Sequence, residues 1–317
     1  MHTDISLIIP IDVRDAYGNV IADAGDEATP DLLATVACCG RFTGSCRIGL
    51  NGSMLRRDME AVLQSDPYFH IFSGERLARV LQIYDSLRVL PVLFEEFEGM
   101  RQRDRYIYEH TLKTAGLTAL FAYDMFGEEK APLIGYTALT HDLGMTRLPD
   151  EILKEDIGED AAKRFVLYGH TVIGHVLLAY YTGSPDFSNP RVALYHHERP
   201  NGSGYPSGIA LQDRVIELIS VADTFDALIS PRPFRQKPIE LRQVLDYLLE
   251  RAKRGYFSEA VVRLLITYNR EGGSATTEAV VSEVARLGLP DDHYIDWSAW
   301  KSSWQEICLL FGRRGKR

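Results

Sequence analysis

Residues 141–153 decide the fold; they read His-Asp-Leu-Gly-Met-Thr-Arg-Leu-Pro-Asp-Glu-Ile-Leu. The pair His141-Asp142 ends a predicted helix over residues 131–143 that is otherwise mostly apolar. Gly144 follows at the position where helices commonly stop. A carboxylate beside a histidine at a buried helix end costs free energy unless a cation neutralises it. The stretch therefore predicts a helical protein with a metal ion near its core.

Further candidate ligands lie on other predicted helices. The chain has nine histidines, and six of them fall between residues 110 and 197. His110 and His170 share helix faces with apolar residues, so both point inward. Asp223 interrupts an apolar helix, where an unpaired carboxylate is costly. The candidate metal ligands are His110, His141, Asp142, His170, His196, His197 and Asp223.

Two neighbouring residues are expected to play other roles. His175 lies about 140° around its helix from His170, at the ~100° step per residue of an α-helix, and is excluded. Asp226 follows Asp223 by one helical turn and is expected to orient a neighbour rather than bind metal.

These ligands predict a dinuclear centre. Helix bundles hold two ions with side chains from facing helices, and one aspartate can bridge the ions. Imidazole and carboxylate ligands without thiolates favour iron, manganese or zinc. The alternative is a set of hydrogen-bonded core histidines without metal, because a single helical histidine is usually such a residue.

The beginning of the chain differs from the rest. We expect a strand over Ile5–Val13, a second near Val20, a helix from Pro30 to Gly40 and a strand near Ile48. Apolar spacings of three and four then predict helices over 105–126, 131–143, 161–182, 190–198, 212–229, 238–252 and 258–268.

The expected fold class is mainly α, a helical bundle with a small N-terminal α+β module. Residues 1–53 form the module and residues 54–103 a helical linker. Residues 104–270 form the helical domain with the metal site. Residues 271–317 form a C-terminal helical extension, whose three tryptophans share a spacing of three and four.

Composition excludes several classes of partner. The chain has 35 basic and 44 acidic side chains and a net charge of −9, which argues against binding nucleic acid polymers or anionic membranes. No apolar run approaches the ~20 residues of a membrane-spanning helix. The first residues lack the basic and apolar segments that are typical of a signal peptide. The four cysteines match no zinc or disulfide framework. We expect a cytoplasmic protein.

Residues 141–153 and several later segments together resemble the HD-GYP phosphodiesterase family. The first is similar to the family's HD motif. The others, in the expected order, are His196-His197-Glu198, Asn201-Gly-Ser-Gly-Tyr205-Pro206, Val221-Ala-Asp223-Thr-Phe-Asp-Ala-Leu and Arg232-Pro-Phe-Arg235. The likeness covers about residues 104–255 and implies an HD-type helical bundle. The N-terminal module more loosely resembles short domains found before HD-GYP domains.

The resemblance implies a hydrolase that opens cyclic di-GMP to pGpG or GMP at two divalent ions, iron before manganese. By position, His110, His141, Asp142 and Asp223 would hold one ion, and His170, His196, His197 and Asp142 the other. Asp142 would bridge them as the catalytic residue. Tyr205, Arg232 and Arg235 match positions that contact the dinucleotide, and Gly204 would let the backbone approach it closely.

Three departures from the family pattern leave alternatives open. Met145 stands where the family usually has lysine, so phosphate binding should weaken or the substrate differ. Pro200 and Asn201 replace an aromatic residue and an aspartate. Tyr106 replaces a glutamate that accompanies a third metal in some members, so we expect two ions.

Two other functions remain open: a receptor that binds metal and cyclic dinucleotide with little turnover, and a phosphohydrolase for another nucleotide. Cyclic di-GMP and mixed cyclic GMP-AMP are both retained as substrates. A homodimer and protein partners of the N-terminal module are left open as well.

Overall fold

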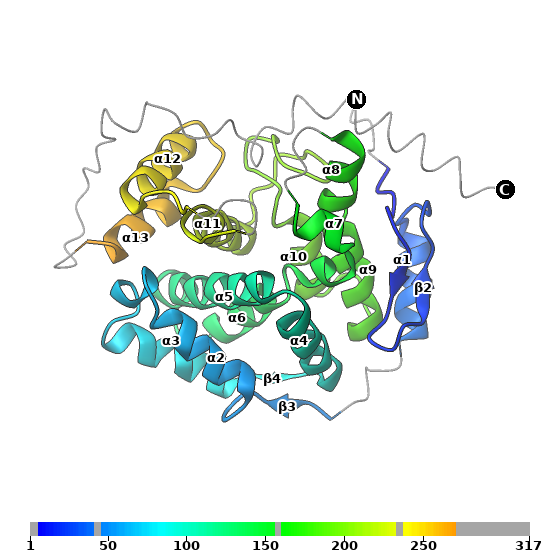
Figure 1. The fold of residues 1–317 in the computed structure, drawn as a ribbon, viewed down its shortest axis with the longest axis horizontal. Helices are drawn as coiled ribbons and strands as arrows, with labels where there is room; N and C mark the ends of the chain where they lie inside the picture. Colours follow the sequence, from blue (N-terminus) through cyan, green and yellow to red (C-terminus); the bar gives the residue numbers. More distant parts are fainter. Residues whose placement is uncertain (1–5, 41–45, 156–159, 233–236, 271–317) are drawn as a thin grey trace.

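The computed structural model describes residues 6–40, 46–155, 160–232 and 237–270 (Figure 1). Helices dominate these residues, and strands form two short antiparallel pairs within them. The predicted fold class, mainly α, is confirmed. The predicted C-terminal extension and Arg235 lie outside the described residues.

The N-terminal segment packs against the helices. Strand β1 (Val13–Arg14) pairs with β2 (Val20–Ala22), and α1 (Pro30–Cys39) follows. The side chain of Thr29 caps α1 by accepting from the amide of Leu32, with Pro30 at the first position, as predicted. The long first strand is wrong, because β1 begins only at Val13 and Ile8 forms an isolated bridge.

The next segment contains, in order, β3 (Ile48–Gly49), α2 (Met54–Leu63), η1 (Tyr68–His70), α3 (Glu75–Ser86), β4 (Arg88–Val89) and α4 (Pro91–Arg103). Strand β3 pairs with β4, so the end of the proposed N-terminal module is hydrogen-bonded to the proposed linker. Helix α4 contains many charged residues from Glu95 to Arg103, yet it buries Glu96, Phe97 and Met100.

The central helices surround α5 (Arg105–Phe126), whose predicted bounds are confirmed. Asp104 begins it by accepting a hydrogen bond from the amide of Ile107. The others are α6 (Ala131–Leu139), η2 (Leu143–Arg147), α7 (Asp150–Leu153), α8 (Ala161–Tyr168), α9 (His170–Thr182), α10 (Ser188–Tyr195), α11 (Arg214–Ile229), α12 (Leu241–Lys253) and α13 (Glu259–Tyr268). Helix α5 packs against α6 on one side and α11 on another.

Two predicted helices are wrong in their bounds. The helix over 161–182 is two helices that meet at Gly169, where an added Cβ would lie 2.3 Å from the Pro10 ring. The helix over 131–143 ends at Leu139, so His141 and Asp142 lie in the turn before η2. Among the described residues, no helix combines the length and the apolar composition needed to cross a membrane.

Candidate metal centre

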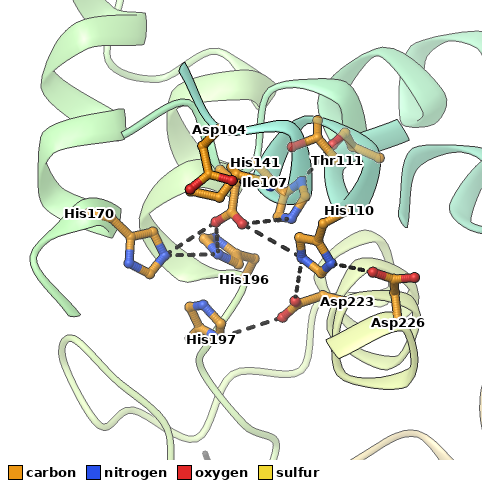
Figure 2. Close-up of polar contacts among 12 residues, drawn as sticks. Asp104, Ile107, His110, Thr111, His141, His170, His196, His197, Asp223 and Asp226 are labelled. Atoms are coloured by element: carbon orange, nitrogen blue, oxygen red, sulfur yellow. Dashed lines mark hydrogen bonds and ion pairs between the residues drawn. The ribbon is translucent and has the colours of Figure 1, made fainter. Parts of the chain in front are cut away.

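The structure brings all seven predicted metal ligands together (Figure 2). They come from α5, the turn after α6, α9, the end of α10 and α11. None of the seven is more than 9% exposed. Polar side chains buried this deeply need partners of their own, and here they face one another.

Asp142 lies at the centre of the cluster. Its Oδ1 atom is 3.3 Å from Nε2 of His170 and 3.3 Å from Nε2 of His196. Its Oδ2 atom is 3.5 Å from Nε2 of His141 and 3.7 Å from Nε2 of His110. The two carboxylate oxygens therefore face two different pairs of histidines.

The ligand atoms form two groups. Those of Asp142, His170, His196 and His197 lie within 4.8 Å of one another, and so do those of His110, His141 and Asp142. Asp223 adds a contact to each group: Oδ1 is 3.1 Å from Nε2 of His110, and Oδ2 is 3.7 Å from Nδ1 of His197. The two groups share the carboxylate of Asp142.

Hydrogen bonds behind the rings orient three of the histidines. Nδ1 of His141 lies 2.7 Å from the carbonyl oxygen of Ala138, and Nδ1 of His170 lies 2.6 Å from that of Leu167. His196 contacts the carbonyl oxygen of Ala193 in the same way. Because a carbonyl only accepts, each Nδ1 carries the proton and each Nε2 presents a lone pair to Asp142.

The electrostatics keep most of these groups in the forms that bind metal. The exception is His110: burial alone lowers its pKa, but hydrogen bonds to Asp223 and Asp226 bring that pKa well above its usual value. Burial lowers the pKa of His170 to about 4 and also lowers the pKa values of His141 and His197. Burial alone raises the pKa of Asp142, but the surrounding histidines, His141 foremost, bring it well below its usual value. Neutral rings around a charged carboxylate are the ligand forms that a divalent cation requires.

Two atoms of the cluster show that the residues fit a metal. Asp142 Oδ1 and His141 Nε2 are buried and have no hydrogen-bond partner among the described residues. A lone pair that faces a carboxylate oxygen is unfavourable unless a cation lies between them. Nitrogen and oxygen donors without thiolates suit divalent ions such as iron, manganese and zinc.

Asp226 and His175 lie where the sequence predicts. Asp226 Oδ2 is 2.7 Å from Nδ1 of His110, so this carboxylate orients a ligand from behind. His175 belongs to neither ligand group, and its Nδ1 atom donates to the carbonyl oxygen of Pro190 at 2.9 Å.

Glu198 was quoted in the sequence only as part of a motif and was given no role, yet it fixes the loop after α10. One of its oxygens accepts from the amides of Ser207 (2.6 Å) and Gly208 (3.0 Å), and the other from that of Ile209 (3.1 Å). Burial raises its pKa to about 7 despite these amides. The glutamate after the paired histidines was the signal that could have identified it.

That loop brings Tyr205 against the cluster. The Tyr205 ring stacks on His197 at 4.5 Å and on Tyr168 at 4.3 Å between centroids. The structure gives a further reason for glycine at position 204, because an added Cβ would lie 2.3 Å from the carbonyl oxygen of His197; the substrate contact stays a prediction. The close approach at Gly204 is to the protein's own backbone.

Arg232 lies beside the Tyr106 ring, and Met145 lies in η2, three residues after Asp142. The Arg232 guanidinium is 5.6 Å from the centroid of the Tyr106 ring, which in turn stacks on His110 at 6.0 Å. Met145 lines a cavity of about 230 Å³ together with Asp104 and Ile107. Arg235, the other predicted substrate contact, is outside the described residues.

The sequence of the chain is similar to a protein family and to several known proteins. Residues 122–261 match a protein family described as HD domain. The cyclic di-GMP phosphodiesterase of Thermotoga maritima is 34% identical over 164 residues, which are 50% of this chain and 42% of that protein.

Two further relatives differ in the extent of their match. The cyclic di-GMP phosphodiesterase response regulator RpfG of Xanthomonas campestris is 35% identical over 111 residues, 34% of this chain and 29% of the relative. The 3'3'-cGAMP-specific phosphodiesterase 1 of Vibrio cholerae is 24% identical over 284 residues, 81% of this chain and 60% of the relative. The chain thus spans less than two thirds of each relative's length.

Proposed function

We propose that the chain is a member of the HD-GYP family of HD-domain proteins and that it hydrolyses a cyclic dinucleotide at a dinuclear metal centre. The match of residues 122–261 to an HD domain and the similarity to cyclic di-GMP phosphodiesterases support this proposal. The observation that carries the proposal is the position of Asp142, whose two oxygens face two groups of histidines. The names of the relatives support cyclic di-GMP as substrate and mixed cyclic GMP-AMP as a second substrate. We propose pGpG or GMP as the product from cyclic di-GMP.

We assign the ligands by group. His110, His141, Asp142 and Asp223 would hold one ion, and His170, His196, His197 and Asp142 the other. When bound, two such ions supply an activated water and neutralise charge on the phosphate. Iron is our first assignment and manganese our second, because the donors are imidazole and carboxylate.

The remaining residues bind and orient the substrate in this proposal. The Tyr205 ring is held flat against His197, so its position relative to the centre is constrained by stacking. The Arg232 guanidinium lies beside the stacked pair of Tyr106 and His110, where it would form charge-assisted hydrogen bonds with phosphate oxygens. The carboxylate of Glu198 keeps the loop that carries Tyr205 in place.

Hydrolysis is tested with a pair of variants in one helix. Anaerobically prepared protein loaded with iron or manganese is incubated with cyclic di-GMP, and linear products are separated by chromatography. We expect His170→Gln to lose at least ~100-fold in rate, because a ligand of one ion is removed. His175→Gln, also buried in α9, should retain most of the rate. Equal losses in both variants would contradict the ligand assignment.

A receptor function is favoured by one observation, the thioether of Met145 at the position where the family usually has lysine, three residues after Asp142. A thioether supplies no positive charge for a phosphate. Tight binding of cyclic di-GMP by the metal-loaded protein without any linear product would support the receptor. Absence of both binding and product would favour a phosphohydrolase for another nucleotide.

A further inference from the structure

Tyr68 reaches the metal centre from a segment before the matched HD domain. It lies in η1, and its side chain is 0% exposed. Its hydroxyl donates to Oδ1 of Asp226 at 2.8 Å, across 158 residues of sequence. We propose that Tyr68 is a positioning residue, which holds Asp226 so that His110 presents Nε2 to a metal ion. This inference rests on the proposed metal centre.

Asp226 is the group through which Tyr68 acts. Its Oδ1 atom accepts from the hydroxyls of Tyr68 and Ser230, the latter at 2.7 Å, and the ammonium of Lys113 is 3.9 Å away. Its Oδ2 atom faces Nδ1 of His110 at 2.7 Å. Donors on Oδ1 hold the carboxylate with Oδ2 toward His110. Tyr68 thus helps keep Asp226 correctly rotated.

The rotation of Asp226 decides which nitrogen of His110 carries the proton. With Asp226 as acceptor, Nδ1 carries a proton, and Nε2 faces Asp223 Oδ1 at 3.1 Å and Asp142 Oδ2 at 3.7 Å. A metal ion between these atoms would take the place of the proton on Nε2. If Asp226 turned away, a proton on Nε2 would hydrogen-bond to Asp223 and compete with the metal ion. The hydroxyl of Tyr68 therefore favours the tautomer that binds metal.

Packing fixes the hydroxyl in place. The Tyr68 ring meets Phe225 edge to face, with centroids 6.0 Å apart, and stacks on Phe72 at 6.2 Å. The Lys113 ammonium lies 5.8 Å from the ring centroid. A side chain held on several sides has one rotamer available, so the hydroxyl is preorganised for Asp226.

Metal affinity gives a readout independent of turnover. Mn²⁺ dissociation constants of the full chain are measured by competition with a chelator, for wild type and for Tyr68→Phe, which keeps the ring. We expect one of two ions to bind about tenfold more weakly, the low end of the range for groups behind metal ligands. Tyr84→Phe is the matched control, because Tyr84 is also 0% exposed and donates to a backbone carbonyl, that of Gly135.

A second variant tests the inference in case Tyr68→Phe does not fold. Ser230→Ala removes the other hydroxyl on Asp226, and it should weaken the same ion. The inference is overturned if Tyr68→Phe and Ser230→Ala both bind the two ions as tightly as wild type and Tyr84→Phe do. Where Tyr68→Phe does not fold, wild-type affinity of Ser230→Ala for both ions is the result that overturns it. A wild-type chain that binds less than about one ion would instead overturn the metal centre, and the inference with it.

Discussion

Met145 is the residue at which the site departs most clearly from the HD-GYP pattern that it resembles. It is half-buried and lines the cavity shared with Asp104 and Ile107. We predict that Met145→Lys binds cyclic di-GMP about tenfold more tightly, because an ammonium forms a charge-assisted hydrogen bond with phosphate. The dissociation constant is measured by calorimetry on the metal-loaded protein.

The control for this prediction adds the same charge elsewhere. Leu133 is 58% exposed on α6, so Leu133→Lys changes the net charge without placing a cation in the cavity. An equal gain in affinity from both variants would show a general electrostatic effect. That result, or no gain from Met145→Lys, would refute a local role for position 145.

His175 makes stability depend on pH. Burial lowers its pKa below the ordinary histidine value, so the unfolded chain takes up the proton first as the pH falls. The stability that this neutral ring contributes is present above about pH 6.5 and is lost as the pH falls further. We predict a shallower pH dependence of the free energy of unfolding for His175→Gln. Urea unfolding between about pH 7 and pH 5.5 measures it; parallel curves would refute the prediction.

Individual residues of the site were predictable where the chemistry is local. A histidine beside an aspartate, and an aspartate within an apolar helix, indicated Asp142 and Asp223 without any structure. Tyr68 could not be predicted, because its hydrogen bond spans 158 residues and leaves no spacing pattern. Gly204 was interpreted as a ligand contact, since sequence cannot show that the backbone of His197 occupies that space.

At the scale of elements, the centre depends on how closely η2 approaches α9. A Cβ added to Gly144 would lie 1.9 Å from the carbonyl oxygen of His170 and 2.7 Å from the amide nitrogen of Gly174. Glycine at this position therefore lets the turn that carries Asp142 lie against the helix that carries His170. The sequence suggested a helix end at Gly144, but the helix ends earlier, at Leu139, and the approach of η2 to α9 is the reason that the structure gives for this glycine.

Gly144→Ala should separate these two elements. The neighbouring atoms are backbone and cannot move cheaply, so we predict a loss of about 1–3 kcal/mol in the free energy of unfolding and weaker Mn²⁺ binding. Urea unfolding and metal titration measure the two effects. Gly99→Ala in α4 meets nothing within 4 Å and should stabilise by about 0.5–1 kcal/mol. An unchanged metal affinity in Gly144→Ala would contradict the account.

Elements were predicted best where a helix is long and its ends carry local signals. Helix α5 has the predicted bounds because Asp104 caps it. The helix over 161–182 was predicted without a break. The break is at Gly169, which lies against the ring of Pro10, a residue far away in the sequence. The first strand was overestimated, since the backbone from Leu7 to Ile9 pairs only through an isolated bridge with residues 25–28 and not as one continuous strand with β1.

At the scale of the whole molecule, Arg147 joins the N-terminal module to the helices around the centre. Its Nε atom donates to the carbonyl oxygen of Arg14 at 2.6 Å. Its guanidinium pairs with Glu96 of α4, which also accepts from the hydroxyl of Tyr181 in α9. Because Arg147 ends η2, this network ties three parts of the chain to the turn that carries Asp142.

Removing Arg147 should destabilise the whole protein. Arg147→Met would leave the Glu96 carboxylate, which is 5% exposed, without its cation, and we predict a loss of about 3–5 kcal/mol. Arg254→Met breaks an exposed pair with Glu250 and should cost about 1 kcal/mol or less. Urea unfolding compares the two; similar losses would show that the network has no special role.

The account depends most on the claim that Asp142 is shared by two metal ions. The direct measurement is the metal content per chain, by elemental analysis after anaerobic loading with Mn²⁺ and removal of free metal, for wild type and Asp142→Ala. We predict about two ions per wild-type chain and less than about one in Asp142→Ala, because both groups lose the same carboxylate. Fewer than about one ion in wild type, or two in both proteins, would contradict the shared dinuclear centre.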